Sequence, residues 1–242
     1  MYQPRFYREW TKDKDLVSFS VVVKETDLYV RARRNLKRKA LKAVLKYRAL
    51  LEKYIERHPE FLTALEPLEV GGDAPQIVKD MAEAARKAGV GPMAAVAGAI
   101  AEYVGRELLP FSSEVIVENG GDIFLKTLKK RLVGVYAGES SFTGKIALEV
   151  QPEETPLGIC TSSGTVGHSL SFGRSDACIV LSPSTSLADA AATAIGNLIV
   201  EARDIPRGID FAKNVEGIKG VAIIKDDQIG IWGGVKILPV EG

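Results

Sequence analysis

Residues 115–126 read Val-Ile-Val-Glu-Asn-Gly-Gly-Asp-Ile-Phe-Leu-Lys. Two apolar runs, Val115–Glu118 and Ile123–Lys126, flank the segment Asn119-Gly120-Gly121-Asp122. Asn-Gly between two such runs is the strongest short-range signal for a β-hairpin, so the stretch predicts two antiparallel strands and a tight turn. The hairpin alone explains the pattern. The alternative is a ligand-binding turn, in which the glycines let a ligand approach the backbone closely and Asp122 accepts a hydrogen bond from a ligand hydroxyl or amine.

Outward from this hairpin, strands and helices are interspersed without a strict β-α-β rhythm, which favours a mixed α+β fold over a parallel doubly wound sheet. Alternation around a short polar link predicts an N-terminal hairpin of Val17–Val23 and Leu28–Ala32. Further strands are expected at Leu132–Tyr136, Ile146–Val150, Ala177–Leu181, Val221–Ile224 and Ile229–Trp232. Helices are expected at about Asn35–Arg57, from Asp73 as N-cap through Pro75 to a stop at Gly89, around Met93–Ala101, and at Leu187–Ala202.

Composition sets the broad class of protein. The 242 residues are 46% hydrophobic and 26% charged, with a net charge of +1, which is ordinary globular usage and gives no support to a nucleic-acid binder. The two cysteines, Cys160 and Cys178, fit a reducing compartment. Neither a signal peptide nor a membrane-spanning stretch is visible, so we expect a cytoplasmic location without membrane attachment.

The segment Ser182–Ala194 contains the first candidate site. Asp189 and Thr193 are four residues apart, so a helix would stack them on one face. A carboxylate and a hydroxyl in that arrangement suit Mg²⁺, with phosphate oxygens completing its coordination. A capping box formed by Ser186 and Asp189 explains the aspartate without any ligand, and Thr193 would then be a small residue at a helix contact.

The segment Cys160–His168 contains the second candidate, with three hydroxylated residues followed by glycine, Thr161-Ser162-Ser163-Gly164. Small residues let backbone N–H groups approach an anion closely, as phosphate-binding loops do, although the spacing and the lysine of a P-loop are absent. An ordinary polar loop is the alternative. His168 is a candidate general base or a hydrogen-bonding spacer, and Cys160 shows no sign of activation as a nucleophile.

The expected helix near the N-terminus is rich in basic residues. Such a run is compatible with binding to nucleic acid or an anionic membrane, but a solvated helix face is the simpler interpretation because aromatic residues are not interleaved in its first part. The basic residues are Arg31, Arg33, Arg34, Lys37, Arg38, Lys39, Lys42 and Lys46.

The order of these motifs, from about Ala94 onward, resembles the ApbE-like superfamily, whose best-known members are Mg²⁺-dependent FAD:protein FMN transferases. Residues 187–194, Leu-Ala-Asp-Ala-Ala-Ala-Thr-Ala, resemble the family's Ala-Asp-Ala-Leu-Ala-Thr-Ala helix. The aspartate and threonine of that helix are metal ligands, which the resemblance assigns to Asp189 and Thr193. It also implies the family's fold, in which largely antiparallel sheets pack with helices.

Two other motifs support the resemblance. Residues 118–122 resemble the family's Asn-x-Gly-Gly-Asp hairpin, and residues 160–164 are similar to the Ala-Thr-Ser-Gly stretch before a family histidine that corresponds to His168. The resemblance thus implies His168 as the catalytic residue. The implied ligand-binding residues are Gly120, Gly121, Asp122, Thr161, Ser162, Ser163 and Gly164.

Three positions depart from the family's pattern. Glu102 stands where the family's Gly-Gly-Ile-Ala-Lys-Gly segment has lysine, and Glu118 stands where the hairpin motif has asparagine. After His168 the chain continues Ser-Leu-Ser-Phe, where the family has Ile-Ile-Asp-Pro. The similarity therefore indicates a divergent branch of the superfamily.

We expect one domain over 1–242, with the hairpin and basic helix in 1–70 and the ligand site in 74–242. The resemblance implies a Mg²⁺-dependent transferase or hydrolase acting on a flavin, FAD or FMN, or on another diphosphate-containing nucleotide, with a protein as a further candidate substrate. Two alternatives stay open: a non-catalytic flavin or nucleotide binder on the same scaffold, and an interaction protein using the basic helix 31–46. Small-residue helices pack equally well between subunits, so a homo-oligomer also stays open.

Overall fold

The computed structural model describes residues 15–164 and 173–240 of the chain. Its central element is a sheet of eight antiparallel strands in the order β1-β2-β3-β4-β7-β8-β9-β10. Their bounds are β1 Val17–Val23, β2 Thr26–Ala32, β3 Val115–Asn119, β4 Asp122–Lys126, β7 Leu157–Ser162, β8 Ala177–Ser182, β9 Gly220–Lys225 and β10 Gln228–Gly233.

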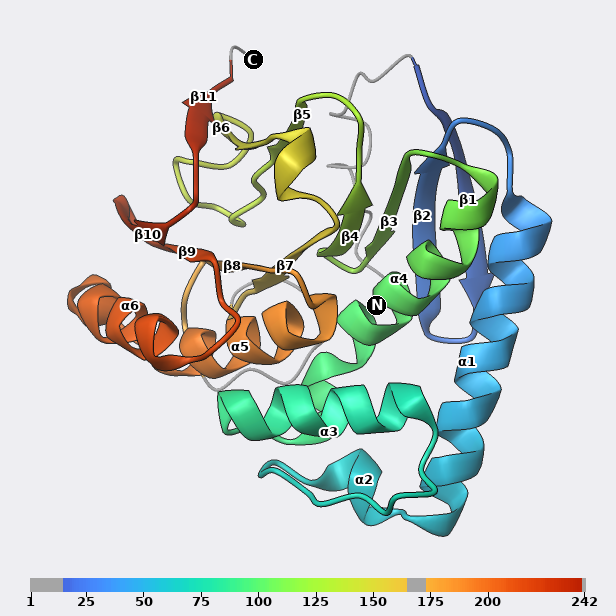
Figure 1. The fold of residues 1–242 in the computed structure, drawn as a ribbon. Coiled ribbons are helices and arrows are strands. Elements are labelled where there is room, and N and C mark those ends of the chain that lie inside the picture. Colours follow the sequence, from blue (N-terminus) through green and yellow to red (C-terminus); the bar gives the residue numbers. More distant parts are fainter. Residues whose placement is uncertain (1–14, 165–172, 241–242) are drawn as a thin grey trace.

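Helices cover one face of this sheet (Figure 1). The bounds are α1 Lys37–Arg57, α2 Glu60–Thr63, α3 Gln76–Ala88, α4 Val96–Leu108, α5 Thr185–Asn197 and α6 Ile205–Asn214. Four of them, α1, α4, α5 and α6, contact the strands directly, whereas α3 packs on α5 from the side away from the sheet. The main apolar core lies between helices and sheet, and Gly98 lets α4 and α5 approach closely.

A second, smaller sheet covers part of the opposite face. It has the order β11-β6-β5 and consists of β5 Arg131–Gly134, β6 Ile146–Val150 and β11 Ile237–Pro239. Its residues Leu148 and Val150 join Leu125, Ile159 and Ile179 of the large sheet in a second apolar cluster. The central strands β4, β7 and β8 are therefore buried on both faces, which explains why their sequences are nearly continuous apolar runs.

The mixed α+β class and the largely antiparallel sheets are confirmed. Three local predictions were wrong. No side chain caps α3, which starts after Pro75, so Asp73 is not its N-cap, although Gly89 ends the helix with a left-handed φ of 69° as predicted. The helix predicted at Leu187–Ala202 spans Thr185–Asn197. Thr161 and Ser162 belong to strand β7 and not to a loop, because they pair with β8.

Within the described ranges, no single helix is long and apolar enough to span a membrane. The pair Gln76–Ala88 and Pro92–Phe111 passes the same length and composition test jointly, with a bend of 106° between its two halves.

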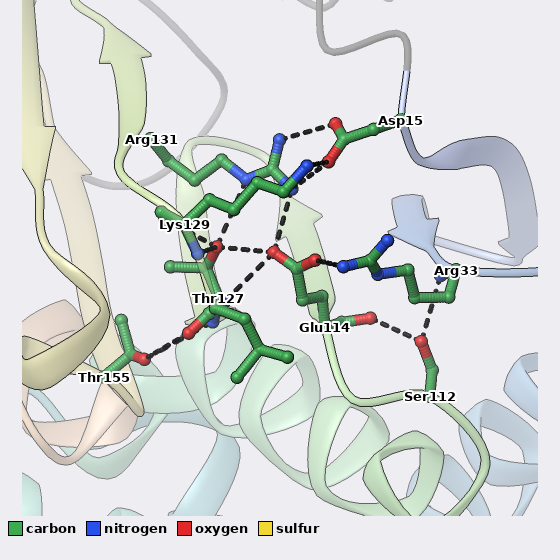
Figure 2. Close-up of polar contacts among 9 residues, drawn as sticks. Asp15, Arg33, Ser112, Glu114, Thr127, Lys129, Arg131 and Thr155 are labelled. Atoms are coloured by element: carbon green, nitrogen blue, oxygen red, sulfur yellow. Dashed lines mark hydrogen bonds and ion pairs between the residues drawn. The ribbon is translucent and has the colours of Figure 1, made fainter.

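A buried polar cluster joins the large sheet to the small one (Figure 2). Glu114, just before β3, is 0% exposed, and one carboxylate oxygen accepts hydrogen bonds from the Thr127 hydroxyl at 2.7 Å, the Leu128 N–H at 3.1 Å and Arg131 at 2.9 Å. Its other oxygen pairs with Arg33 at 2.6 Å. Because its carboxylate is paired and hydrogen-bonded, this buried charge is stabilised where an isolated one would not be.

Arg131 extends the cluster toward the N-terminal part of the chain. Its guanidinium donates to both carboxylate oxygens of Asp15, at 2.8 and 3.0 Å, just before β1. Since Arg131 is also the first residue of β5, the cluster holds together the segments that lead into β1, β3 and β5. We call this group, made of Asp15, Arg33, Glu114, Thr127 and Arg131, the Glu114 cluster.

Candidate functional site

Helix α5 is almost completely enclosed, and its two exceptions coincide with the predicted metal ligands. From Thr185 to Gly196 every residue is buried except Asp189 and Thr193, which are partly exposed. The two lie one turn apart on a single face, because residues four apart are stacked on a helix. In an otherwise buried helix, two polar residues therefore share the open stripe.

The start of α5 shows that Asp189 is not a capping residue of its own helix. The N-cap is Ser184, whose hydroxyl accepts a hydrogen bond from the Leu187 N–H at 3.2 Å. Glu102 of α4 accepts further bonds from the N–H groups of Thr185 at 2.7 Å and Ser186 at 3.4 Å. The capping box predicted for Ser186 and Asp189 is wrong, since the helix starts earlier and its N-terminus is capped by Ser184 and Glu102.

Asp189 instead binds the first turn of α4. Its carboxylate accepts a hydrogen bond from the Gly98 N–H at 2.8 Å. The helices touch here, because a Cβ on Gly98 would lie 2.5 Å from the Thr185 carbonyl oxygen and 2.8 Å from the Asp189 Cβ. Helices α4 and α5 thus cap each other reciprocally: Glu102 binds the N-terminus of α5, and Asp189 binds the N-terminus of α4.

Burial dominates the electrostatics of the site. It raises the pKa of Asp189 to about 7, against the lowering effect of hydrogen bonds from the Gly98 and Ala97 N–H groups. Burial also raises the pKa of Asp122 well above its ordinary value, and the negative charge of Asp189 raises it further. The two carboxylates are therefore close enough to oppose each other's ionisation, which a bound cation would relieve.

Asp122 has an unsatisfied oxygen. It is the first residue of β4, is 7% exposed, and its Oδ1 has no hydrogen-bond partner within the described part of the chain. Buried polar atoms are normally satisfied, so each exception calls for an explanation such as an unseen ion or ligand. Asp122 and Asp189 together indicate a site suited to a positive charge.

The hairpin turn is held rigidly beside these carboxylates. Gly120 and Gly121 both have positive φ, 69° and 106°, which explains the two glycines. The Asn119 amide donates to the Ala97 carbonyl at 3.1 Å, and the Glu118 carboxylate accepts from the Gly121 N–H at 3.0 Å. Glu118 therefore braces the turn, in the position where the resembling motif has asparagine.

The hydroxylated stretch lies next to this turn. A Cβ on Gly121 would be 3.7 Å from the Thr161 carbonyl oxygen, and the Thr161 N–H hydrogen-bonds Asp122 and lowers its pKa. Further along, Ser162 lies against α5, with its hydroxyl 3.4 Å from where a Cβ on Gly196 would be. The structure thus brings Gly121, Asp122 and Thr161 together.

The remaining predicted residues are placed less centrally. Ser163 and Gly164 both hydrogen-bond the carbonyl of Ser175, at 3.5 and 2.9 Å, and so lie toward the far end of α5. Gly120 lies in the hairpin turn with Gly121. His168 lies outside the described residues.

Cys160 is completely buried, and its burial, with the negative charges of Asp122 and Asp189 nearby, raises the pKa of the thiol well above its ordinary value. A thiolate is thus strongly disfavoured at this position, in agreement with the interpretation of Cys160 as a structural residue.

Glu102, Gly98 and Asn119 act at the site through contacts with segments distant in the chain. The sequence singled out Glu102 as a departure from the resembling pattern and Asn119 as part of the hairpin turn. It did not indicate the contacts that these three residues make.

Comparison with solved structures places this arrangement in a known class. The flavinyl transferase ApbE of Pseudomonas stutzeri, in its apo form, superposes with a TM-score of 0.56 at 15% identity, covering 90% of this chain and 94% of that one. The flavin transferase ApbE of Vibrio cholerae gives a TM-score of 0.57 at 15% identity, covering 90% and 96%. At this identity the likeness establishes the fold: the chain is an α+β protein with the fold of ApbE flavin transferases.

Sequence comparison gives the family. The family model described as AbpE bacteria matches residues 8–222. A UPF0280 protein of Methanocella arvoryzae is 45% identical over 194 residues, 80% of this chain and 79% of the relative. A second UPF0280 protein, from Methanocaldococcus jannaschii, is 42% identical over 220 residues, 88% and 89% of the two chains. The chain therefore belongs to the AbpE bacteria family, with archaeal UPF0280 proteins as relatives.

Proposed function

We propose that this protein is a Mg²⁺-dependent transferase or hydrolase that acts on a flavin dinucleotide or another nucleotide with a diphosphate bond. The observation that carries the proposal is the open stripe of α5, where Asp189 and Thr193 alone escape burial between Thr185 and Gly196. Two solved proteins of the same fold are flavin transferases, which supports a flavin as the first ligand to test.

The residues present fit a magnesium ion. Asp189 and Thr193 would hold it through a carboxylate and a hydroxyl, the hard oxygen donors that Mg²⁺ prefers. Within the described residues, no three His, Cys, Asp or Glu side chains gather as a metal site. Such a short donor set is typical of Mg²⁺ sites that substrate phosphates complete, and a bound Mg²⁺ would supply polarisation of a phosphoryl oxygen.

The protein's own residues then have distinct roles. The Gly98 N–H orients the Asp189 carboxylate from behind. The N–H groups of Gly121 and Thr161 already bind Glu118 and Asp122, so the Thr161 hydroxyl would donate to phosphate oxygens. Asp122 would accept a hydroxyl or amine of the ligand or face the cation. His168 would accept the proton of the incoming hydroxyl. The diphosphate bond breaks, a nucleoside monophosphate leaves, and the incoming oxygen belongs to water in a hydrolase or to a protein side chain in a transferase.

The direct test is Asp189→Ala incubated with FAD and Mg²⁺, with products separated by chromatography. We expect the wild type to release AMP in a Mg²⁺-dependent reaction and the variant to be slower by about 100-fold or more, as for loss of a metal ligand. Asp210→Ala is the matched control, because that aspartate is 70% exposed on α6 and pairs with Lys213. Undiminished, Mg²⁺-dependent turnover by Asp189→Ala would contradict the assignment.

A second candidate is a flavin or nucleotide binder without turnover, and Glu102 is the observation that favours it. Its carboxylate occupies the N–H groups at the start of α5, which would otherwise be available to bind phosphate. Native mass spectrometry of the purified protein, with and without Mg²⁺, separates the two candidates. A retained flavin or nucleotide that is never cleaved supports the binder and contradicts the enzyme.

A further inference from the structure

A groove remote from the candidate site runs along β1, which is the edge strand of the large sheet within residues 15–164 and 173–240. Its volume is about 370 Å³, and it is lined by Ser20, Val21 and Val22 of β1 and by Lys37 and Leu41 of α1. On the helix side Leu41 is 39% exposed and Leu45, one turn further along α1, is 50% exposed. Val22 is 64% exposed, with its side chain on the face of β1 that points away from α1. We call this surface the β1–α1 groove.

The strand side of the groove has backbone groups available for pairing. Strand β1 is the edge strand and pairs with β2 in a hairpin closed by Val23 and Thr26 around two turn residues. In such a hairpin the closing pair exchanges its hydrogen bonds inward, so Val22, Ser20 and Ser18 direct their N–H and C=O groups outward. The strand reads Val-Ser-Phe-Ser-Val-Val-Val, without the charge or proline that usually protects an exposed edge.

The helix side of the groove carries only positive charges. Every charged residue from Arg31 to Leu51 is Lys or Arg. Several of them have partners: Arg33 pairs with Glu114, Lys46 with Glu107, and Arg48 with Glu25 and Glu52.

Three basic side chains in the first half of α1 do not have such partners among the described residues, and one of them, Lys37, lines the groove. Within the described part of the chain, Lys37, Arg38 and Lys42 make neither hydrogen bonds nor ion pairs through their side chains. All three are exposed on the first half of α1, next to Leu41. The groove therefore combines an open strand edge, apolar side chains and positive charge.

We propose that the β1–α1 groove binds an extended, acidic segment of a partner protein as a ninth strand of the large sheet. Strand addition supplies main-chain hydrogen bonds along β1, and alternate side chains of the added strand fall toward α1. Apolar side chains there cover Leu41 and Leu45, while carboxylates meet Lys37, Arg38 and Lys42. Charge complementarity thus selects an acidic strand from the many segments able to pair with an edge.

The same charges disfavour a second copy of this chain as the occupant. Two β1 strands paired antiparallel about Ser20 keep their two α1 helices on the same face of the sheet. Lys37, Arg38 and Lys42 of both copies would then lie near each other without intervening acids, and like charges repel. Nucleic acid and lipid headgroups match the charge, but they do not pair with a strand edge.

The experiment uses the full chain and a fluorescein-labelled peptide of alternating Glu and Val as the probe. We expect anisotropy to report binding of this peptide, and hydrogen exchange to slow at the amides of Ser18, Ser20 and Val22. A peptide with Pro in place of each Val keeps the charge but cannot form a strand, and one with Lys in place of each Glu reverses the charge. Each should bind at least about tenfold more weakly.

Two variants test the two halves of the surface. Ser20→Pro removes an outward N–H and should weaken peptide binding by about tenfold or more, with Ser20→Ala as the control. The double variant Lys37→Glu, Lys42→Glu changes two exposed side chains and should also weaken peptide binding by about tenfold or more. It tests the proposal even if Ser20→Pro does not fold.

Other outcomes overturn the proposal. Equal binding of the Val and Pro peptides would show that the glutamates bind the basic side chains without any strand pairing. A dimer seen by light scattering and lost in Ser20→Pro would assign the edge to a second copy. Competition by duplex DNA or phosphatidylserine vesicles, with no protection of the β1 amides, would assign the basic face to those ligands.

Discussion

Asp189 carries a carboxyl group that burial makes difficult to ionise. Burial raises its pKa to about 7, although hydrogen bonds from the Gly98 and Ala97 N–H groups lower it. The negative charge of Asp189 in turn raises the pKa of Asp122 of β4. An unfolded aspartate titrates near pH 4. The stability that the protonated form contributes is therefore complete below about pH 4 and is lost as pH rises through about 7. A cation bound to the carboxylate would reverse that loss.

This gives a prediction at the residue scale. Without Mg²⁺, Asp189→Asn should flatten the fall in Tm of the wild type between about pH 5 and pH 8, because the amide does not ionise. Added Mg²⁺ should raise the Tm of the wild type more at about pH 8 than at pH 6 and leave the Tm of Asp189→Asn unchanged. Scanning calorimetry measures both. Asp210→Asn, changed at a 70% exposed carboxylate, should behave like the wild type; an equal Mg²⁺ response of Asp189→Asn would contradict the ligand assignment.

At the scale of elements, the contact between α4 and α5 orients the open stripe. Gly98→Ala would place a Cβ 2.5 Å from the Thr185 carbonyl oxygen, so the helices must separate. We expect a loss of about 1–3 kcal/mol in the free energy of unfolding, typical of overpacking, and weaker Mg²⁺ binding by calorimetry. Gly72→Ala is the control, since nothing lies within 4 Å of its added Cβ. If both variants unfold like the wild type, α4 and α5 are not in close contact.

The reciprocal capping gives a second prediction at this scale. Glu102→Ala leaves the N–H groups of Thr185 and Ser186 without their acceptor. We expect a loss of about 1–3 kcal/mol, the usual range for a buried hydrogen bond to a charged group. Glu83→Ala, in an exposed pair with Arg86 on α3, should cost less than about 1 kcal/mol. Urea unfolding measures the difference, and equal losses would mean that Glu102 has no special role.

The elements also show what the sequence could predict. The hairpin at Asn119–Asp122 and the end of α3 at Gly89 depend on local backbone preferences, so they were visible in the sequence. The true N-cap of α5 was not, because Ser184 and Ser186 are equally good caps by residue type and only the contact with Glu102 decides where the helix starts. Thr161 and Ser162 were predicted in a loop because hydroxyl-rich segments favour turns, and pairing with β8 overrides that preference.

For the candidate site, sequence reasoning selected residues of three separate elements, β4, β7 and α5, and of the segments next to them. Asp122, Thr161 and Asp189 lie together in the structure, and the interaction between Asp122 and Asp189 needs their spatial closeness and cannot be read along the chain. The roles of Gly98 and Asn119 also depend on tertiary contacts. The Gly98 N–H binds Asp189 of α5, and the Asn119 amide binds the Ala97 carbonyl of α4.

At the scale of the whole molecule, the Glu114 cluster joins the beginnings of β1, β3 and β5 (Figure 2). Burial raises the pKa of Glu114, but hydrogen bonds from Thr127, Leu128 and Arg131 outweigh it, and the net pKa lies below the ordinary value. The hydrogen bonds of Arg131 and Lys129 likewise lower the pKa of Asp15. Stability from both groups is present above about pH 4 and is lost as pH falls through their lowered folded pKa values.

Glu114→Ala should therefore be strongly destabilising, by about 3–5 kcal/mol, because it leaves Arg131 buried with one fewer partner. Glu114→Gln keeps the shape and should show a shallower loss of stability than the wild type below about pH 4. Urea unfolding at a series of pH values checks both. A wild-type acid profile in Glu114→Gln would mean that this carboxylate does not link acid to unfolding.

The mutual capping of α4 and α5 has a kinetic consequence. Each helix start near the candidate site is already neutralised by a carboxylate, Glu102 or Asp189, so neither offers its N–H groups to an incoming phosphate. A bare nucleotide would approach the carboxyl groups of Asp122 and Asp189, and its own negative charge would be repelled by them. The competent ligand is then the cation–nucleotide complex. Initial rates should follow the concentration of that complex, with uncomplexed nucleotide a poor competitor even in large excess.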